Sequence, residues 1–447
     1  MTAPFDYAEK FESFKRQTLY ERLVPQQQDF IRNIAFAHHF TFQEFRQVVE
    51  ICRDLGMWRG GSLEDWWKIA TAQTAAKGPQ LKKLLIQNLL AHISKLKSAP
   101  VIYPTAALTR PKQREKNLIT TEDSEKKIHG MCPVASEKTV CCNLRTIDAV
   151  ENCIFGCSYC TIQTFYSDNI VFHENFAEKL RAIHLEPDRF YHFGTGQSSD
   201  ALAWGNRNGI LEAICQFAAD HPNVLMELKT KSDNIRYFLD HDIPANIVCS
   251  WSLNTPTIIA NEEHFTANLE QRLEAARRMA DRGVKVAFHF HPMVYYESWQ
   301  RDYPAIAVQL LSRFTTAEVL FISFGSVTLI KPVMQKIRAL GYETKILQTA
   351  LVADPHGKLT YADDVKIRLF KTMYESLSPW RDKVFMYLCM EKAAIWESAF
   401  GYVYGSNEEF EKDFGFKTMS KLPHRLNDGT AEPLEGSYFI SASPPFS

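Results

Sequence analysis

The sequence predicts an α/β fold: a partial (β/α)6 barrel with an all-α N-terminal domain and a mostly helical C-terminal extension. Short apolar segments of strand type alternate with segments of helical periodicity, which is the rhythm of a parallel sheet. The helical segments include Leu211–Ala219, Glu270–Arg282 and Pro304–Arg313. We expect the barrel to span residues 141–350 and to stay open on one side. The candidate strands are Arg145–Val150, Arg189–Phe193, Val224–Leu228, Ile247–Ser252, Val284–Phe290, Val319–Ser323 and Thr344–Leu347.

The composition is that of a globular protein with a sizeable core. Of the 447 residues, 45% are hydrophobic and 23% are charged, which is ordinary for such proteins. The formal net charge of −1 excludes wholesale wrapping around nucleic acid, so any such contact would be a local patch. No apolar run reaches the length of a membrane span, and the first residues show no signal-peptide pattern. Ten cysteines without such a signal indicate metal binding in a reducing compartment, and we expect a cytoplasmic protein without membrane contact.

The first part of the chain, residues 1–97, is expected to form a compact helical domain. Thr41 and Glu44 have the form of a capping box. One interpretation is a helix-turn-helix module that reads DNA; a structural cap on the barrel is the simpler one, because helical pairs with short turns are common. The expected helices are Gln26–His38, Phe42–Leu55 closed by Gly56, a short helix opened by Ser62 that carries Trp66 and Trp67, and Leu81–Leu96.

Residues 98–140 are expected to form a linker that wraps the barrel, because prolines punctuate them and periodicity is lost. The basic run Arg110–Lys116 would suit a phosphate backbone, although a solvated loop is the simpler interpretation. Cys132, Cys141 and Cys142 raise the question of a second cluster. Their spacing matches no ligation pattern, so buried packing is the interpretation we favour.

Three cysteines, Cys153, Cys157 and Cys160, follow the first predicted strand with the spacing Cys-x3-Cys-x2-Cys. Three thiolates on one tight loop can bind three irons of a [4Fe–4S] cluster. The fourth iron then lacks a protein ligand, and a substrate or cofactor can take that position. Zinc is the alternative, but it requires four closed ligands, and only Cys141 and Cys142 lie near enough in sequence to complete such a set.

Polar and glycine residues follow the ends of four later strands, where α/β folds place their sites. Glycines let the backbone approach a ligand, and a lysine suits a carboxylate, although a turn and a surface lysine are the common alternatives. A histidine pair on one strand would either contact a substrate or be structural. In strand order, these residues are Gly194 and Gly196, then Lys231, then Ser252 and Asn254, then His289 and His291.

Together these segments resemble the spore photoproduct lyase family of radical S-adenosylmethionine (radical SAM) enzymes. The resemblance implies a partial radical SAM barrel in which the three motif cysteines hold the cluster. It also implies that Ser199, Lys231 and Ser252 contact S-adenosylmethionine, and that the Gly194–Gly196 turn receives its amino group. The segments that carry the resemblance, within about residues 140–350, are Cys153–Cys160, Gly194–Asp200, Thr230–Lys231, Ser252–Asn254, Gln271–Ala276 and His289–Pro292.

The chemistry that the resemblance implies begins with an external electron donor such as flavodoxin or ferredoxin. The reduced cluster cleaves S-adenosylmethionine to a 5′-deoxyadenosyl radical, which takes a hydrogen atom from the substrate. Family members that repair DNA act in this way on a thymine dimer. We therefore expect nucleic acid as the substrate class, for repair of a DNA photoproduct or modification of a base.

Two departures from the family pattern make true lyase activity doubtful. Gln197 stands where a lyase carries its hydrogen-donating cysteine, and an amide cannot donate a hydrogen atom to a carbon radical. The tyrosine that follows the last motif cysteine is here Thr161, although Tyr159 remains inside the motif. Cys249 or Cys389 would be substitutes, but buried packing is the simpler interpretation of each.

The C-terminal extension, residues 351–447, is expected to close the barrel or cover the substrate. Helices are expected over Leu369–Leu377 and Ala393–Phe400, around a strand-like segment, Val384–Cys389. Two alternatives to a nucleic-acid enzyme stay open. One is radical modification of a protein, RNA or small molecule by the same barrel. The other is a non-catalytic, metal-stabilised nucleic-acid-binding protein.

Overall fold

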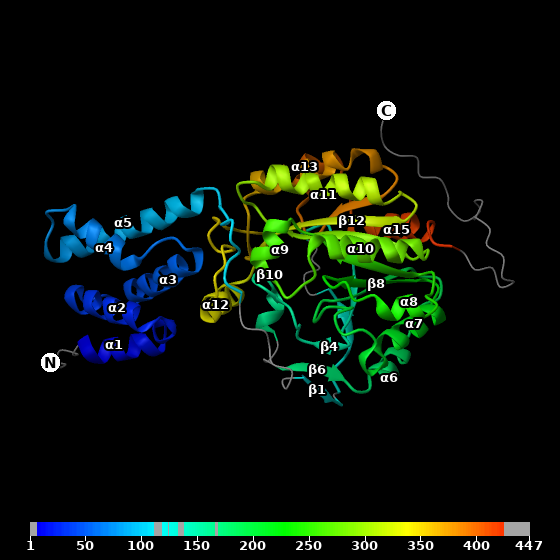
Figure 1. Ribbon diagram of the computed structural model, residues 1–447, viewed down its shortest axis with the longest axis horizontal. Helices are drawn as coiled ribbons and strands as arrows, with labels where there is room; N and C mark the ends of the chain where they lie inside the picture. The colour runs from blue at the N-terminus through cyan, green and yellow to red at the C-terminus, as the bar shows by residue number, and fades with distance from the viewer. Residues whose placement is uncertain (1–6, 111–118, 124, 133–137, 166–168, 424–447) are drawn as a thin grey trace.

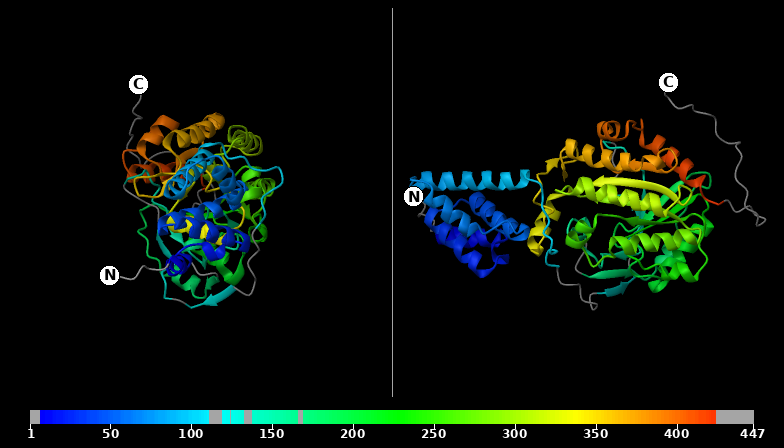
Figure 2. Two further views of the ribbon diagram at one scale, coloured as in Figure 1. Left: turned by 90° about the vertical axis from the view of Figure 1, so that its left-hand side faces the viewer. Right: turned by 45° about the horizontal axis from the view of Figure 1, so that its top comes forward.

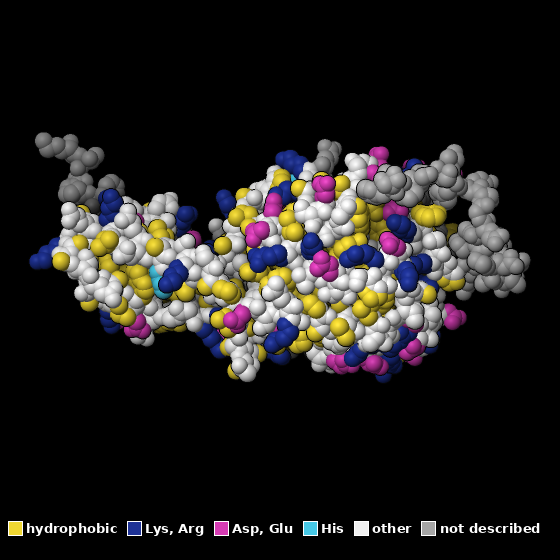
Figure 3. Space-filling view, turned by 90° about the horizontal axis from the view of Figure 1, so that it is seen from above, with side chains coloured by type: hydrophobic (Ala, Val, Ile, Leu, Met, Phe, Trp, Pro, Cys, Tyr) yellow, Lys and Arg dark blue, Asp and Glu magenta, His cyan; other side chains and the backbone are white. Residues whose placement is uncertain are grey.

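The chain forms a group of N-terminal helices beside a larger α/β body (Figure 1). The computed structural model describes residues 7–110, 119–123, 125–132, 138–165 and 169–423. Most of the basic run Arg110–Lys116 lies outside these residues. In the right-hand view of Figure 2 the N-terminal helices project from one end of the body. On the face shown in Figure 3, acidic and basic side chains are interspersed over the body without a large patch of one sign.

The N-terminal helices follow the sequence expectation closely. Both hydrogen bonds of the capping box between Thr41 and Glu44 are present. Gly56 lies inside the second expected helix rather than closing it, and Arg59 ends that helix in the left-handed conformation. Trp67 is buried in the core, as packing predicted. The elements are α1 (Tyr7–Arg16), η1 (Tyr20–Arg22), α2 (Pro25–His38), α3 (Phe42–Trp58), α4 (Leu63–Ala72) and α5 (Gly78–Ser98).

A helix of the body, α12 (Lys331–Leu340), joins the body to α3. The Arg338 guanidinium donates two hydrogen bonds of 2.7 and 2.8 Å to the Asp54 carboxylate. The backbone N–H of Thr344 donates to the carbonyl of Met57, and its hydroxyl donates to Glu262. The predicted strand Thr344–Leu347 is therefore wrong, because its polar groups bind the N-terminal helices and α9 instead of a neighbouring strand.

One curled sheet forms the body, with strand order β16-β12-β11-β9-β8-β7-β3-β2. Only β2 pairs in antiparallel fashion; the other pairs are parallel. The C-terminal extension contributes β16, so the sheet takes its last strand from outside the predicted barrel. The strands are β2 (His129–Met131), β3 (Arg145–Ile147), β7 (Tyr191–Thr195), β8 (Val224–Thr230), β9 (Ile247–Ser252), β11 (Lys285–Met293), β12 (Val319–Ser326) and β16 (Phe385–Leu388).

Three smaller sheets flank the large one. The predicted strand Arg145–Val150 is split, because β3 ends at Ile147 and Val150 begins a strand of another sheet. The smaller sheets are β1 (Ile119–Glu122), β6 (Ile170–His173) and β4 (Val150–Glu151); β5 (Gly156–Cys157) with β10 (Glu263–His264); and β13 (Thr328–Leu329), β15 (Leu359–Thr360) and β14 (Val352–Ala353).

Helices connect the parallel strands, as the alternating pattern predicted. Within the described residues, no helix combines the length and apolarity needed to cross a bilayer. The helix α15 follows the predicted ones and was not expected. The helices are η3 (Thr161–Thr164), α6 (Phe176–Arg181), η4 (Arg207–Gly209), α7 (Ile210–Asp220), α8 (Arg236–Asp240), α9 (Pro256–Glu262), α10 (Leu269–Asp281), α11 (Trp299–Arg313), α13 (Asp363–Ser376), η5 (Ser378–Trp380), α14 (Ala393–Phe400) and α15 (Asn407–Met419).

Candidate active site

A cavity of about 860 Å³ lies on the inner side of the curled sheet, at the carboxyl ends of its parallel strands. This volume is in the range of ligand-binding pockets. One side, here called the motif wall, is formed by Cys153, Cys157, Tyr159 and Cys160. A second group of lining residues, here called the thiol wall, consists of Cys132, Cys141, Cys142 and Cys389.

The motif loop is fixed to the segment that follows α9. Strand β5 within the motif pairs with β10 in antiparallel fashion. The N–H of Ser158 donates to the carbonyl of Glu262, and the N–H of Cys153 donates to the side chain of Asn152 at 2.9 Å. These backbone contacts fix the loop without using the three thiols, which all line the cavity.

A buried ion pair supports the motif wall from behind. Arg272 of α10 donates to Glu263 at 2.6 Å, and both side chains are almost fully buried. The hydroxyl of Tyr159 donates to the other oxygen of Glu263, and Asn254 donates to that same oxygen at 3.2 Å. Burial raises the pKa of Glu263, but Arg272 and then Lys231 lower it more, so its pKa falls below the ordinary value.

The three motif thiols are in an environment that favours a bound cation. Burial raises the pKa of Cys153 to about 12 and that of Cys157 well above its ordinary value. Buried thiolates therefore need bound cations to be stable. Cys141 and Cys142, the partners that a zinc site would need, line the same cavity.

Next to the motif wall, two predicted cofactor residues have groups directed at the cavity. The Ser199 hydroxyl is buried and has no hydrogen-bond partner among the described residues. Lys231 lies 5.7 Å from the ring centre of Tyr159. Burial lowers the pKa of Lys231, but Glu263 and Cys157 more than compensate, so its pKa is raised and it stays a cation. An unsatisfied hydroxyl beside a buried cation fits the carboxylate and amino groups of an amino-acid ligand.

The remaining predicted cofactor residues differ in position. Gly194, Gly196 and Ser252 line the cavity, whereas the fully buried Asn254 amide bonds to Glu263 and to the carbonyl of Pro292. A side chain at Gly196, whose φ is +93°, would place its Cβ 2.7 Å from the carbonyl oxygen of Lys229. A glycine is therefore required at position 196 by its close contact with β8, independently of any ligand.

The predicted catalytic histidines belong to a buried hydrogen-bonded network. Glu227 of β8 accepts hydrogen bonds from His192 at 2.8 Å, from His289 at 2.5 Å and from Ser250 at 2.5 Å. His289 and His291, two residues apart on β11, both line the cavity. The sequence did not single out Glu227 or Lys229, although their spacing of two on β8 places both on the same face of the strand, just before Lys231.

The thiol wall lies where the two edges of the sheet meet. Val140 bridges to Glu391, just beyond β16, and the N–H of Cys132 donates to the carbonyl of Leu144 at 2.8 Å. Gln197 also lines the cavity. Of the two predicted substitute thiols, Cys389 lines the cavity, whereas Cys249 is buried within β9 in the core.

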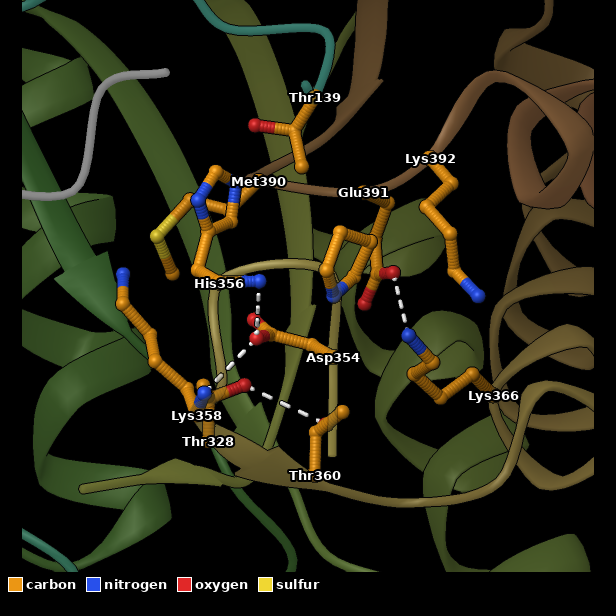
Figure 4. Close-up of a pocket in the computed structure, with 11 residues that line it drawn as sticks. Thr139, Thr328, Asp354, His356, Lys358, Thr360, Lys366, Met390, Glu391 and Lys392 are labelled. Carbon is orange, nitrogen blue, oxygen red and sulfur yellow. Dashed lines mark hydrogen bonds and ion pairs between the residues drawn. The ribbon is translucent and has the colours of Figure 1, made fainter. Parts of the chain in front are cut away.

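A second, much smaller cavity of about 20 Å³ adjoins the thiol wall (Figure 4). It lies between the β14–β15 hairpin and the ion pair of Lys366 with Glu391, whose atoms are 2.6 Å apart. This volume holds a single water rather than a ligand. Lys358 of the hairpin lines both cavities, and in Figure 4 its side chain runs away from the Lys366–Glu391 pair.

Comparison with known proteins gives a consistent result. Residues 144–338 match the family model described as spore photoproduct lyase. Over this part of its length the chain is similar to the spore photoproduct lyases. The enzyme of Clostridium acetobutylicum is 23% identical over 178 residues, which are 38% of this chain and 53% of that protein. The enzyme of Bacillus subtilis is 24% identical over 163 residues, 35% of this chain and 48% of that protein. The chain thus matches about half the length of these spore photoproduct lyases.

Solved structures of spore photoproduct lyase share the fold. A variant with bound S-adenosylmethionine and dinucleoside spore photoproduct superposes with a TM-score of 0.51 at 18% identity, covering 68% of this chain and 93% of that one. A complex with dinucleoside spore photoproduct gives a TM-score of 0.51 at 17% identity, covering 64% and 87%. At these identities the likeness establishes the curled α/β sheet as a shared fold.

Proposed function

We propose that this protein is a radical SAM enzyme that acts on nucleic acid. The observation that carries the proposal is the motif wall: three thiols facing one cavity, beside the Lys231 cation and the unsatisfied Ser199 hydroxyl. We assign the [4Fe–4S] cluster to Cys153, Cys157 and Cys160. We assign S-adenosylmethionine to Ser199, Lys231, Ser252 and the Gly194–Gly196 turn.

The proposal extends to the architecture and the partners. Residues 141–350 would form the (β/α)6 radical SAM barrel, with β16 as an added strand from the extension. Residues 1–97 would cap the barrel through α3 and α12. An external one-electron donor such as flavodoxin or ferredoxin would reduce the cluster. When bound and reduced, the cluster and cofactor would supply a 5′-deoxyadenosyl radical that abstracts hydrogen from the substrate.

The chain's own residues would bind, orient and shield the reacting groups. Lys231 would pair with the cofactor carboxylate, and Ser199 would accept its amino group in a hydrogen bond. The buried Glu263–Arg272 pair would hold Tyr159 and the motif loop in place. The curled sheet would keep water from the cavity interior, where it would otherwise meet a reactive radical.

The return of a hydrogen atom would fall to the thiol wall. Gln197 has no S–H bond to give, but its amide can hydrogen-bond a base edge. A thiol such as Cys389 would break its S–H bond, form a C–H bond on the substrate and become a thiyl radical. The Cys389 thiol would be restored when this thiyl radical takes a hydrogen atom from 5′-deoxyadenosine, which would leave the deoxyadenosyl radical as the co-product. Radical modification without such a return remains the second candidate, and the placement of Gln197 is the observation that favours it.

Anaerobic reconstitution tests the proposal. Wild-type protein should hold about four irons per chain in one cluster and, after reduction, should convert S-adenosylmethionine to 5′-deoxyadenosine. Cys157→Ala should lose both the iron and the product. The matched control is Cys52→Ala, which removes a buried thiol from α3 outside the cavity and should retain both. Stoichiometric zinc without iron would overturn the proposal in favour of a binding protein.

A further inference from the structure

A chain of hydrogen bonds runs from the core of the sheet to the cavity. The Glu227 carboxylate and His289 Nε2 are 2.5 Å apart. His289 Nδ1 lies 2.5 Å from the Ser323 hydroxyl, and that hydroxyl lies 3.1 Å from His291 Nε2. His291 Nδ1 then lies 3.4 Å from the ammonium of Lys229. The chain joins side chains of β8, β11 and β12, and it passes over β9, which lies between β8 and β11 in the sheet.

With both histidines neutral, the two ends of the chain fix the direction of its hydrogen bonds. An ionised carboxylate only accepts, so His289 donates from Nε2, and the neutral ring then accepts at Nδ1 from the Ser323 hydroxyl. The Ser323 oxygen accepts from His291 Nε2. An ammonium only donates, so Lys229 donates to His291 Nδ1. This assignment satisfies every member of the chain.

The electrostatics of the chain agree with that assignment. Burial, followed by the nearby Lys229, lowers the pKa of His289 to about 4 and that of His291 well below its ordinary value. Although burial raises the pKa of Glu227, His289 and His192 lower it overall. The positive charge of the chain therefore resides on Lys229, which uses one of its three N–H donors on His291.

Among the described residues, three carboxylates line the cavity with Lys229, those of Asp148, Asp200 and Glu227, and the last two are hydrogen-bonded to other groups. Asp200 accepts from the N–H of Lys231 and the hydroxyl of Thr230, and Glu227 accepts from two histidines and a serine. No lysine of the cavity forms an ion pair with a carboxylate of the described part of the chain. The lysines that line it are Lys127, Lys229, Lys231 and Lys358.

Lys229 and Lys231 face different parts of the cavity. The charge of Lys231 interacts with Glu263 and the motif thiol Cys157. Burial lowers the pKa of Lys229, and its charge interacts first with Glu227 and then with Cys389 and Cys132 of the thiol wall. Lys358 approaches that same wall from the β14–β15 hairpin, since it lines both cavities there. With Lys231 assigned to the cofactor, Lys229 lies on the side left for the substrate.

We propose that the ammonium of Lys229, held in place by the chain from Glu227 through His289, Ser323 and His291, binds a phosphate group of the substrate beside the thiol wall. This inference rests on the proposed function for the identity of the substrate. An ammonium with donors directed into a cavity of cationic lining favours a phosphodiester over a neutral ligand. Glu227, His289, Ser323 and His291 are positioning residues, since they act on the ligand through Lys229.

Equilibrium binding of two matched probes tests this site without any turnover. The first is the dinucleotide thymidylyl-thymidine, and the second is its methylphosphonate analogue, which has the same shape but no charge on the linkage. Wild-type protein should bind the charged probe about tenfold or more tightly than the neutral one, which corresponds to about 1.4 kcal/mol. Lys229→Met should bring that ratio close to one without weakening the neutral probe. Ser323→Ala, which interrupts the chain, should reduce the ratio in part.

Two controls decide between outcomes. Lys229→Arg keeps the charge and should retain most of the ratio, so it reports on the site even if Lys229→Met folds poorly. Lys371→Met on the exposed surface of α13 should leave the ratio unchanged. Equal affinity of wild-type protein for both probes would contradict the proposed phosphate site. So would a fall of the affinity ratio in Lys371→Met that equals the fall in Lys229→Met. Because 5′-deoxyadenosine formation is measured separately, failure of the phosphate site and failure of the proposed function are distinguishable.

Discussion

The two walls of the cavity are built in different ways. The motif wall is one continuous loop, supported from behind by the fully buried Arg272–Glu263 pair. The thiol wall is assembled from three separate segments of the chain, held by backbone bonds such as the bridge from Val140 to Glu391. The motif wall carries the cysteine spacing on which the resemblance rests, whereas the thiol wall takes no part in that resemblance. The comparison teaches that one wall can be read from a local pattern and the other only from the fold.

The largest effect is expected from removing the support of the motif wall. Arg272→Met leaves Glu263 ionised and buried without its cation, which costs about 3–5 kcal/mol of stability. The free energy of unfolding from a denaturant titration measures this loss. The matched control is Arg313→Met, whose partner Glu270 is largely exposed, and which should cost roughly 0–1 kcal/mol. Similar losses in both variants would show that the motif wall does not depend on its buried ion pair.

The next effect concerns cofactor affinity on the motif wall. Lys231→Met should weaken binding of S-adenosylmethionine by about 2–5 kcal/mol, because a buried carboxylate loses its charged partner. Isothermal titration of the anaerobically reconstituted protein measures the change. Unchanged affinity would show that Lys231 does not bind the cofactor. Lys229→Met should affect this affinity much less, since Lys229 lies beside the thiol wall.

A smaller effect is expected from pH, through the chain that ends at the thiol wall. His289 has a pKa of about 4 in the folded protein, below its ordinary 6.5. Between these values the unfolded chain binds the proton and the folded protein does not, so stability falls as pH falls from 6.5 toward 4. In His289→Gln the dependence of unfolding free energy on pH should be shallower by about one proton in that window. The exposed His184→Gln is the control, and an unaltered slope in His289→Gln would contradict the neutral assignment.

The smallest effect is expected at Gln197. Wild-type protein should be weak on a dinucleotide spore photoproduct, and Gln197→Cys should gain some repair because it adds a thiol to the cavity. Anaerobic incubation with the photoproduct, followed by counting of released thymidine dinucleotide, measures both. Cys389→Ala should lower any repair by the wild type, whereas Cys249→Ala, outside the cavity, should not. Efficient wild-type repair that survives both substitutions would contradict the placement of Gln197.

Local signals allowed the sequence to predict much of this fold. The capping box at Thr41 and strands such as Ile247–Ser252 follow from neighbouring residues alone, and the structure confirms both. The extra strand β16 was seen as strand-like but not placed, because its partner β12 lies far back in the sequence. Thr344–Leu347 had the pattern of a strand, but Thr344 bonds to Glu262 and to α3 instead.

The predictions for the candidate site also divide into those that follow from local sequence and those that depend on distant contacts. That the motif cysteines and Lys231 lie at the carboxyl ends of strands could be predicted because each follows a recognisable strand, and all four line the cavity. Asn254 was expected at the cofactor, but its amide is used by Glu263 and Pro292, which no local pattern reveals. The gathering of Cys132, Cys141 and Cys389 could not be predicted either, since it depends on where the two edges of the sheet come together.

That meeting of the edges has a consequence for how the protein matures. The backbone N–H of Cys141 donates a hydrogen bond to the side chain of Asn407, although the two residues are 266 positions apart in sequence. Contacts of such long range form late in folding, because a very large loop must close first. The hydrogen-bond partners of the motif loop lie much nearer in sequence. The loop should therefore form before the segments of Cys141 and Asn407 come together. A nascent chain would therefore have an interval in which the motif thiols can be reached from this side as well, before Cys141 and Asn407 come together.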